Sequence, residues 1–159
     1  MTERGFVVER VTTPGRLDEA IALRIEVFVD EQGVPVEEEV DGLDRAPTTT
    51  HVVARSTASG AVVGTARLLT DAAHPGEVHV GRVAVAAAGR GTGVGAALMH
   101  VLEETALAEH AASGSVTVVL SAQVQAAGFY ERLGYEVFGP VYLDAGIEHR
   151  DARKTLSAG

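Results

Sequence analysis

Apolar residues recur along this chain with two different periods, and the two periods predict a mixture of helices and strands. The spacing of one helical face is found at Leu17, Ala20, Ile21, Ile25 and Phe28. This spacing predicts a helix from Leu17 to Asp30. It recurs over residues 94–110, where it predicts a second helix. A shorter helix is predicted over residues 125–133, ending before Gly134, because glycine commonly follows the last turn of a helix.

Runs rich in β-branched and aromatic residues predict the strands. They cover residues 6–11, 51–56, 61–69, 78–85, 116–120, 135–138 and 149–155. Thr57–Gly60 separates the second and third runs as a hairpin loop, and Asp144–Gly146 is a turn before the last run. A βα unit comes first, then the hairpin with a third strand, then helices alternating with strands. This order predicts an α/β fold with one mixed sheet flanked by helices.

The composition is that of an ordinary globular domain. The chain has 159 residues, of which 46% are hydrophobic, and no repeat or long linker divides it, so we expect one domain over residues 1–159. It contains no cysteine, which excludes disulfides and cysteine nucleophiles, and its six histidines form no short metal-binding pair, so no metal is expected. Without an apolar run of about 20 residues or an export signal, we expect a soluble cytoplasmic protein that does not contact membranes.

Negative charge is concentrated in one segment of the chain. The net charge is −9, and the acidic segment contains Glu26, Asp30, Glu31, Glu37, Glu38, Glu39, Asp41 and Asp44 without any Lys or Arg. This charge disfavours nucleic-acid binding, which depends on basic residues that replace counterions. Two interpretations stay open: a solvated loop, or the mouth of a site that attracts a cationic substrate.

The segment from Arg90 to Ala96 follows a predicted strand and opens a predicted helix. Its alternate glycines, Gly91, Gly93 and Gly95, allow the backbone to approach a ligand closely and to present consecutive N–H groups. Those groups lie at a helix N-terminus, where an anion is favoured, and Arg90 adds a positive charge. We therefore predict a phosphate-binding turn, with a tight turn that binds nothing as the alternative.

Two other phosphate-binding loops fit this segment less well. A P-loop requires a Lys after its last glycine, and none is present here. The spacing Gly91-x-Gly93-x-x-Ala96 matches a relaxed dinucleotide fingerprint, but that motif needs an acid near the end of the next strand. The next strand ends in Ser121-Ala122-Gln123 instead, so dinucleotide binding is disfavoured.

Several motifs together resemble the GNAT superfamily of N-acyltransferases. Arg90-Gly91-Thr92-Gly93-Val94-Gly95 resembles its [QR]-x-x-G-x-[GA] acyl-CoA loop, and Ala127–Tyr135 is similar to its Phe-Tyr helix. The resemblance to the ElaA-like branch rests on Arg24–Gln32, Pro35, Glu39, Asp41, Asp44 and Gly146–His149. It covers most of the chain from Arg24 to Lys154.

The resemblance implies a fold, a co-substrate and a set of binding residues. The sheet would have six to seven strands and about four flanking helices, and it would open as a V between the strands at 78–85 and 116–120. Acetyl-CoA would bind in that opening, with the pantetheine arm along the backbone of Val83 and Val85 as an added strand. The residues implied for the co-substrate are Val83, Ala84, Val85, Arg90, Gly91, Thr92, Gly93, Val94, Gly95, Ala96, Gln123 and Phe129. Those expected on the side of the acceptor amine are Phe28, Glu31, Gln32, Asp44 and His149.

The chemistry predicted on this basis is direct transfer to a primary amine of a small molecule or peptide. The chain has neither Cys nor a G-x-S-x-G motif, so a covalent acyl-enzyme has no good candidate. Tyr130 matches the general-acid position of the family and would protonate the departing CoA thiolate. His79, on the strand that leads to Val83, is the expected general base. Glu31, Glu77, Asp44, His149 and a chain of water molecules are alternatives to it.

Other functions are compatible with the same motifs. A sensor or interaction module could bind acyl-CoA on this fold without turnover. A second enzyme interpretation keeps the fold and co-substrate but takes a longer acyl group or another acceptor. The acceptor itself is not predicted by any motif, and a homodimer is compatible with the sequence.

Overall fold

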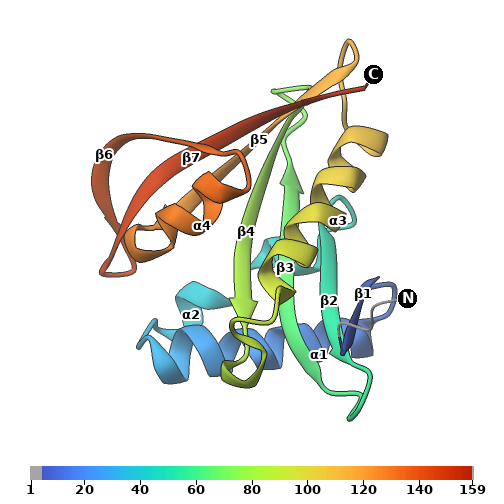
Figure 1. Ribbon diagram of the computed structural model, residues 1–159, viewed down its shortest axis with the longest axis vertical. Helices are drawn as coiled ribbons and strands as arrows, with labels where there is room; N and C mark the ends of the chain where they lie inside the picture. The colour runs from blue at the N-terminus through green and yellow to red at the C-terminus, as the bar shows by residue number, and fades with distance from the viewer. Residues whose placement is uncertain (1–4, 159) are drawn as a thin grey trace.

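The computed structural model describes residues 5–158 and contains a seven-stranded mixed sheet in the order β1-β2-β3-β4-β5-β7-β6 (Figure 1). The strands are β1 Phe6–Arg10, β2 Thr50–Ser56, β3 Val62–Thr70, β4 Glu77–Val85, β5 Ser115–Gln123, β6 Glu136–Asp144 and β7 Ile147–Ser157. Neighbouring strands are antiparallel, except that β4 and β5 are parallel. The predicted mixed sheet with flanking helices is therefore confirmed.

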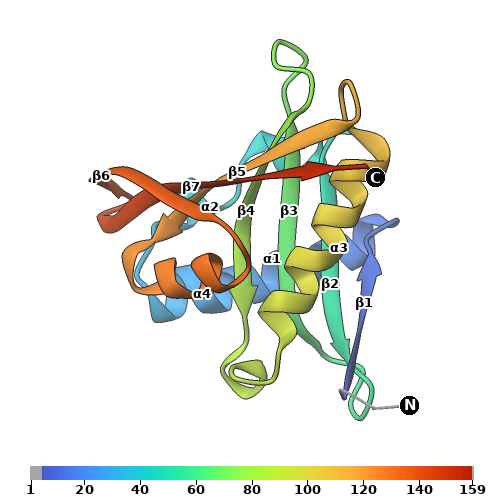
Figure 2. The same ribbon diagram turned by 45° about the horizontal axis from the view of Figure 1, so that its top comes forward.

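Within residues 5–158, four α-helices flank the sheet: α1 Pro14–Arg24, α2 Val36–Glu39, α3 Val94–Glu109 and α4 Ala127–Arg132. The side chain of Thr13 caps α1 by accepting a hydrogen bond from the Arg16 N–H at 3.2 Å. The predicted helix over residues 17–30 is present, but its last part, Ile25–Glu31, is π-helical. The acidic segment, for which a solvated loop was one interpretation, contains α2 and a 3-10 turn over Gly42–Arg45. Figures 1 and 2 show α3 on one face of the sheet and α1 on the other.

Each face of the sheet carries its own core. The larger core packs α3 against the sheet through buried residues that include Leu98, Met99, Leu102, Val52, Leu68, Val78 and Val118. A smaller core lies on the α1 face and joins Leu23 and Val27 to Ala84 of β4. These two cores hold β4 between α3 and the end of the first helix.

The sheet opens between β4 and β5. The two strands pair only over Glu77–Val80 and Thr117–Leu120, whereas β5 continues to pair with β7 as far as Gln123. The rest of β4 diverges from β5, as Figure 1 shows below the point where the two strands meet. Arg82 lies at the start of this divergence with a φ of 53°, beside a register shift between β3 and β4. The V-shaped opening expected from the family resemblance is therefore present between these two strands.

No helix within residues 5–158 is long and apolar enough to cross a membrane.

Candidate functional site

A cavity of about 390 Å³ occupies the opening between β4 and β5. Its walls come from the π-helix, α2, the divergent part of β4, the end of β5, α4 and the β6–β7 turn. Residues predicted as site residues that line it are Phe28, Glu31, Gln32, Val83, Ala84, Val85, Arg90, Gln123, Tyr130 and His149. The fold thus brings residues that are far apart in the sequence to one partly open cavity.

Tyr130 of α4 contributes a buried phenol to this cavity. Its side chain is 7% exposed and makes edge contacts with the rings of Phe129 and Tyr135, at centroid distances of 5.0 and 5.9 Å. Burial raises the pKa of Tyr130 to about 12, because the charged phenolate would lose its hydration. Its hydroxyl forms no hydrogen bond with any residue in 5–158. The hydroxyl is therefore protonated at neutral pH and available to a ligand.

His149 of β7 lies in the same cavity and is held in one orientation. Its Nδ1 is 2.7 Å from the carbonyl oxygen of Ile147, and its ring stacks on Tyr142 at 6.1 Å. Because a carbonyl can only accept, Nδ1 carries the proton, and the neutral ring has its lone pair on Nε2. The arrangement leaves Nε2 without a partner among the described residues.

The glycine-rich turn leads into α3 at one end of the cavity. Gly91 and Gly93 have φ values of 79° and 88°, a conformation that other residues adopt only with strain. Gly93 precedes the first turn of α3, whose N–H groups receive no side-chain cap. Gly95 has a different role, because a Cβ there would lie 3.1 Å from Cζ of Phe129. The first two glycines shape the turn, and the third makes room for the Phe-Tyr helix.

Arg90 links this turn to the strand and to the first helix. Its Nε donates to the carbonyl oxygen of Val85 at 3.0 Å, and its Nη2 donates to Glu31 Oε1 at 2.7 Å. The Ala86 N–H donates to the carbonyl oxygen of Val63, next to β3. Because the backbone N–H and C=O groups of successive strand residues point to opposite edges, those of Val83 and Val85 point away from β3 and toward the opening. Arg90 is therefore hydrogen-bonded to the Val85 carbonyl, one of the backbone groups expected to bind the pantetheine arm.

A second bridge crosses the opening from the π-helix to β5. The side-chain amide of Gln123 donates to Gln32 Oε1 at 2.8 Å. Phe28 and Glu31 of the π-helix and Gln32, which follows its last residue, all line the cavity, whereas Arg24 is buried in the interior. Gln32 and Glu31 thus each form a contact across the cavity, one to Gln123 and one to Arg90.

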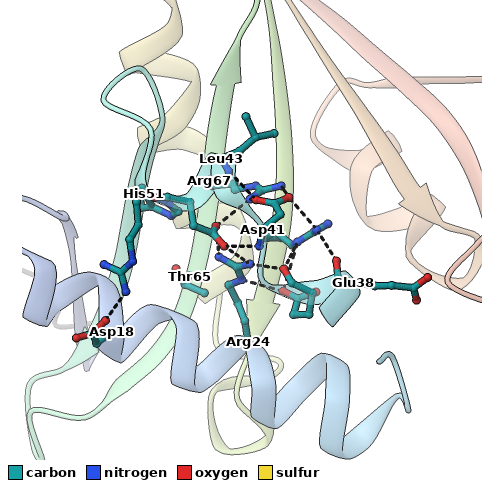
Figure 3. A network of polar contacts seen from close by, with 12 residues as sticks. Asp18, Arg24, Glu38, Asp41, Leu43, His51, Thr65 and Arg67 are labelled. Atoms are coloured by element: carbon teal, nitrogen blue, oxygen red, sulfur yellow. Dashed lines mark hydrogen bonds and ion pairs between the residues drawn. The ribbon is translucent and has the colours of Figure 1, made fainter. Parts of the chain in front are cut away.

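Most of the buried charge of the acidic segment is neutralised inside the protein. Arg24 binds Glu39 Oε1 at 2.8 Å and Asp44 Oδ1 at 2.6 Å, and Arg67 binds Asp41 and Asp44 at 2.8 Å each. Figure 3 shows Arg24, Asp41 and Arg67 of this group pointing toward one another, close to α1. We call this group the arginine–acid cluster; its members are Arg24, Glu39, Asp41, Asp44, Arg67 and Arg82. Asp44 is enclosed in the cluster and does not line the cavity, so the expectation that it contacts the acceptor is corrected.

The cluster also explains how its carboxyl groups ionise. Burial opposes ionisation of Asp44, but the hydrogen bond and charge of Arg24 outweigh it and lower the pKa of Asp44 to about 2. Burial raises the pKa of Glu39 in spite of the hydrogen bond from Arg24. Removing either partner would leave an unpaired charge in the interior.

Arg82 connects the arginine–acid cluster to the cavity wall. Its Nε and Nη2 donate to the backbone carbonyls of Glu39 and Glu38, each at 3.2 Å. This contact fixes α2 against the strained residue at which β4 leaves β5. The charge of Arg82 made pairing with the acidic segment one expectation, and its guanidinium does lie 3.4 Å from Glu39 Oε1 and 3.5 Å from Asp41 Oδ2. Its left-handed backbone conformation had no signal in the sequence. Ser121, Asp144 and Glu38 also line the cavity without having been predicted.

His79 lies outside the cavity. It belongs to the part of β4 that is paired with β5, its side chain is 48% exposed, and its Nε2 is 3.2 Å from Glu77. The structure therefore does not bring the expected base next to Tyr130. Within residues 5–158, no three His, Asp or Glu side chains are placed to hold a metal ion.

Comparison with known proteins gives one consistent family. A family model described as an acetyltransferase (GNAT) domain matches residues 17–156. The protein named as the uncharacterized N-acetyltransferase YjcF of Bacillus subtilis is 37% identical over 140 residues, which is 87% of this chain and 92% of that protein. The crystal structure of Escherichia coli ElaA has a TM-score of 0.82 at 27% identity, covering 94% of this chain and 99% of that one. An acyl-CoA N-acyltransferase from Pseudomonas aeruginosa has a TM-score of 0.76 at 33% identity, covering 94% and 97%.

Proposed function

Because the chain belongs to the GNAT acetyltransferase family, whose members are acyl-CoA-dependent enzymes with acetyl-CoA as co-substrate, we propose that it acetylates a primary amine of a small molecule or peptide. The observation that carries this proposal is the cavity between β4 and β5, which is lined both by a protonated phenol without a hydrogen-bond partner among residues 5–158 and by an imidazole held in one orientation. Transfer is direct, since the chain offers no cysteine as a covalent carrier.

The residues at one end of the cavity fit the co-substrate. The backbone of Val83 and Val85 points into the opening and takes the amides of the pantetheine arm as a strand would. The pyrophosphate takes the N–H groups of the turn from Arg90 to Ala96, which the left-handed Gly91 and Gly93 support. Val94, Thr92 and Gly95 belong to this turn, and Phe129 packs behind it.

Tyr130 acts on the departing sulfur. Burial raises the pKa of Tyr130 above the ordinary pKa of a thiol, about 8.5, so complete transfer of the proton from Tyr130 to the thiolate is unfavourable unless Tyr130 is reprotonated. Tyr130 therefore donates a hydrogen bond as the C–S bond breaks, and it passes its proton to sulfur while the amine nitrogen supplies a replacement. Phe28, Glu31 and Gln32 form the opposite wall, on the acceptor side.

The experiment that tests the proposal measures release of free CoA with a thiol reagent. Purified protein is given acetyl-CoA and a panel of primary amines that contains putrescine, 2-phenylethylamine and a short peptide with a free N-terminus. We expect turnover with at least one amine and acetylated product by mass spectrometry. Binding of acetyl-CoA without turnover of any amine would instead identify an acyl-CoA sensor.

A parallel series with longer acyl-CoA thioesters separates the two enzyme interpretations. Preferred turnover of acetyl-CoA supports an acetyltransferase, and preferred turnover of a longer chain contradicts it.

A further inference from the structure

We infer that His149 is the general base that removes the proton from the acceptor ammonium; this inference rests on the proposed acetyl transfer. His149 lines the same cavity as Tyr130 but comes from β7, on the opposite side of the opening from β4. The cavity is therefore bounded by His149 on the β7 side and by the backbone of Val83 and Val85 on the β4 side.

The ring of His149 is prepared to accept a proton at one defined atom. Donation from Nδ1 to the Ile147 carbonyl fixes the tautomer, and stacking on Tyr142 together with burial to 8% exposure fixes the plane of the ring. Among the described residues, only Arg67 Nε and His110 Nε2 are side-chain polar atoms that lack both a hydrogen-bond partner and solvent exposure. His149 Nε2 also lacks a partner but does not belong to this group, so it keeps some solvent-accessible surface. A fixed, accessible lone pair in a cavity is what a general base requires.

The other titratable groups near the cavity are less suited to this role. Glu31 is ion-paired with Arg90, and Glu39 with Arg24. Asp144 and Glu38 also line the cavity, but both are exposed, and within residues 5–158 no hydrogen bond or ion pair fixes the orientation of either carboxylate. Their negative charges face the approaching ammonium and the imidazolium that His149 forms, and they favour both.

The proton balance of the reaction needs both His149 and Tyr130. The acceptor begins as R–NH3⁺ and gives one proton to His149 Nε2, which later releases it to solvent. The free amine attacks the thioester carbonyl, so a C–N bond forms and the C–S bond breaks with its electron pair on sulfur. The second proton leaves the nitrogen and replaces the proton that Tyr130 has given to sulfur. The products are the amide, CoA–SH and one proton.

The test compares two nucleophiles in a His149→Asn variant. Asparagine keeps a donor near the position of Nδ1 but has no base at the position of Nε2. With an alkylamine from the panel, which is protonated at pH 7, we expect kcat to fall about 100-fold or more. With hydroxylamine, which is already neutral at pH 7, we expect a fall of less than about fivefold. A residue with a purely structural role would lower both rates equally.

Chemical rescue supplies a second measurement in case His149→Asn folds poorly. Imidazole added to His149→Ala should increase the rate of this variant with the alkylamine by about tenfold or more and leave its rate with hydroxylamine unchanged. His74→Gln is the matched control, since His74 is an exposed histidine outside the cavity. Its rates should stay within twofold of wild type.

The failure of this inference is distinguishable from the failure of the proposed function. If wild type turns over no amine, acetyl transfer itself is contradicted. If wild type is active and His149→Asn retains its alkylamine rate, or loses both rates equally without imidazole rescue, the assignment of His149 is overturned. A His79→Gln variant that loses the alkylamine rate selectively would return the role to the histidine expected from the sequence.

Discussion

The hydroxyl of Tyr130 is the single atom on which the proposed chemistry depends most. We expect Tyr130→Phe to lower kcat by about 10²–10⁴-fold, because the departing thiolate loses its hydrogen-bond donor. The KM for acetyl-CoA should change by less than threefold, since the ring and its contacts with Phe129 and Tyr135 remain. Steady-state kinetics with the thiol reagent checks both values. A fall in kcat of less than threefold would exclude the role of the hydroxyl.

Individual residues also show where a sequence-based prediction ends. Tyr130, Arg90 and His149 were assigned to the site from local motifs, and the structure places all three at the cavity. Asp44 was assigned from a run of acids, and a run of acids cannot reveal which of them meet arginines from distant elements. Arg24 and Arg67 lie 20 and 23 positions from Asp44, and only the fold brings them together.

The buried position of Asp44 leads to a prediction for stability. We expect Asp44→Asn to lower the free energy of unfolding by about 3–5 kcal/mol, because the three arginines of the arginine–acid cluster then face only two carboxylates, Glu39 and Asp41, and one buried positive charge is left uncompensated. Asp18→Asn, which breaks an exposed pair with Arg45, should cost less than about 1 kcal/mol. Urea unfolding followed by circular dichroism measures both variants. Equal values for the two would contradict the buried cluster.

The same side chain predicts a pH dependence. The pKa of Asp44 is about 2 in the folded protein, below the ordinary 3.8, so its ionised form stabilises the fold above about pH 4. That contribution is lost as the pH falls from about 4 to about 2. The pKa of Glu39 is raised instead of lowered, but Glu39 is present in both proteins. The difference in unfolding free energy between wild type and Asp44→Asn therefore isolates the effect of Asp44. Urea unfolding should show this difference in unfolding free energy becoming smaller as the pH is lowered from about 4 to about 2.

At the scale of elements, the pattern of apolar residues predicted the first helix least completely. Its apolar spacing predicted the span closely, but the change from α-helix to π-helix at Ile25 has no signature in that spacing. The last two strands, β6 and β7, are longer than predicted. Their pairing with each other and with β5 extends them beyond the short β-branched runs. Local preference thus located the elements, and pairing set their ends.

The end of the π-helix predicts an effect on co-substrate affinity. Glu31 holds Arg90 against the carbonyl edge of β4, and both side chains are partly exposed. We expect Glu31→Gln to lower the KM for acetyl-CoA by about two- to fivefold, because an exposed ion pair contributes up to about 1 kcal/mol and its loss frees Arg90 for phosphate. Asp30→Asn removes the same charge one position earlier and should leave this KM unchanged. An increase in KM for Glu31→Gln would show that the pair assists binding instead.

At the scale of the whole molecule, two parts of the sheet meet over only four residues of β4 and four of β5. The co-substrate proposed to bind beyond that point would bridge the two strands. We expect acetyl-CoA to slow amide hydrogen exchange at Val83 and Val85 by about tenfold or more, because these N–H groups point toward the opening. Exchange at Ala84 and Ala86, which face β3, should change little and serves as the internal control. Residue-resolved NMR exchange makes this comparison.

The close approach of Gly95 to Phe129 bears on any attempt to redesign this enzyme. The two sequence motifs behind the family resemblance are separated by more than 30 positions but touch in space, since even a methyl group at Gly95 would press on the aromatic ring. Transplanting the glycine turn alone into another scaffold would leave it without the surface that it packs against. The turn and the aromatic helix are therefore one module, to be exchanged together.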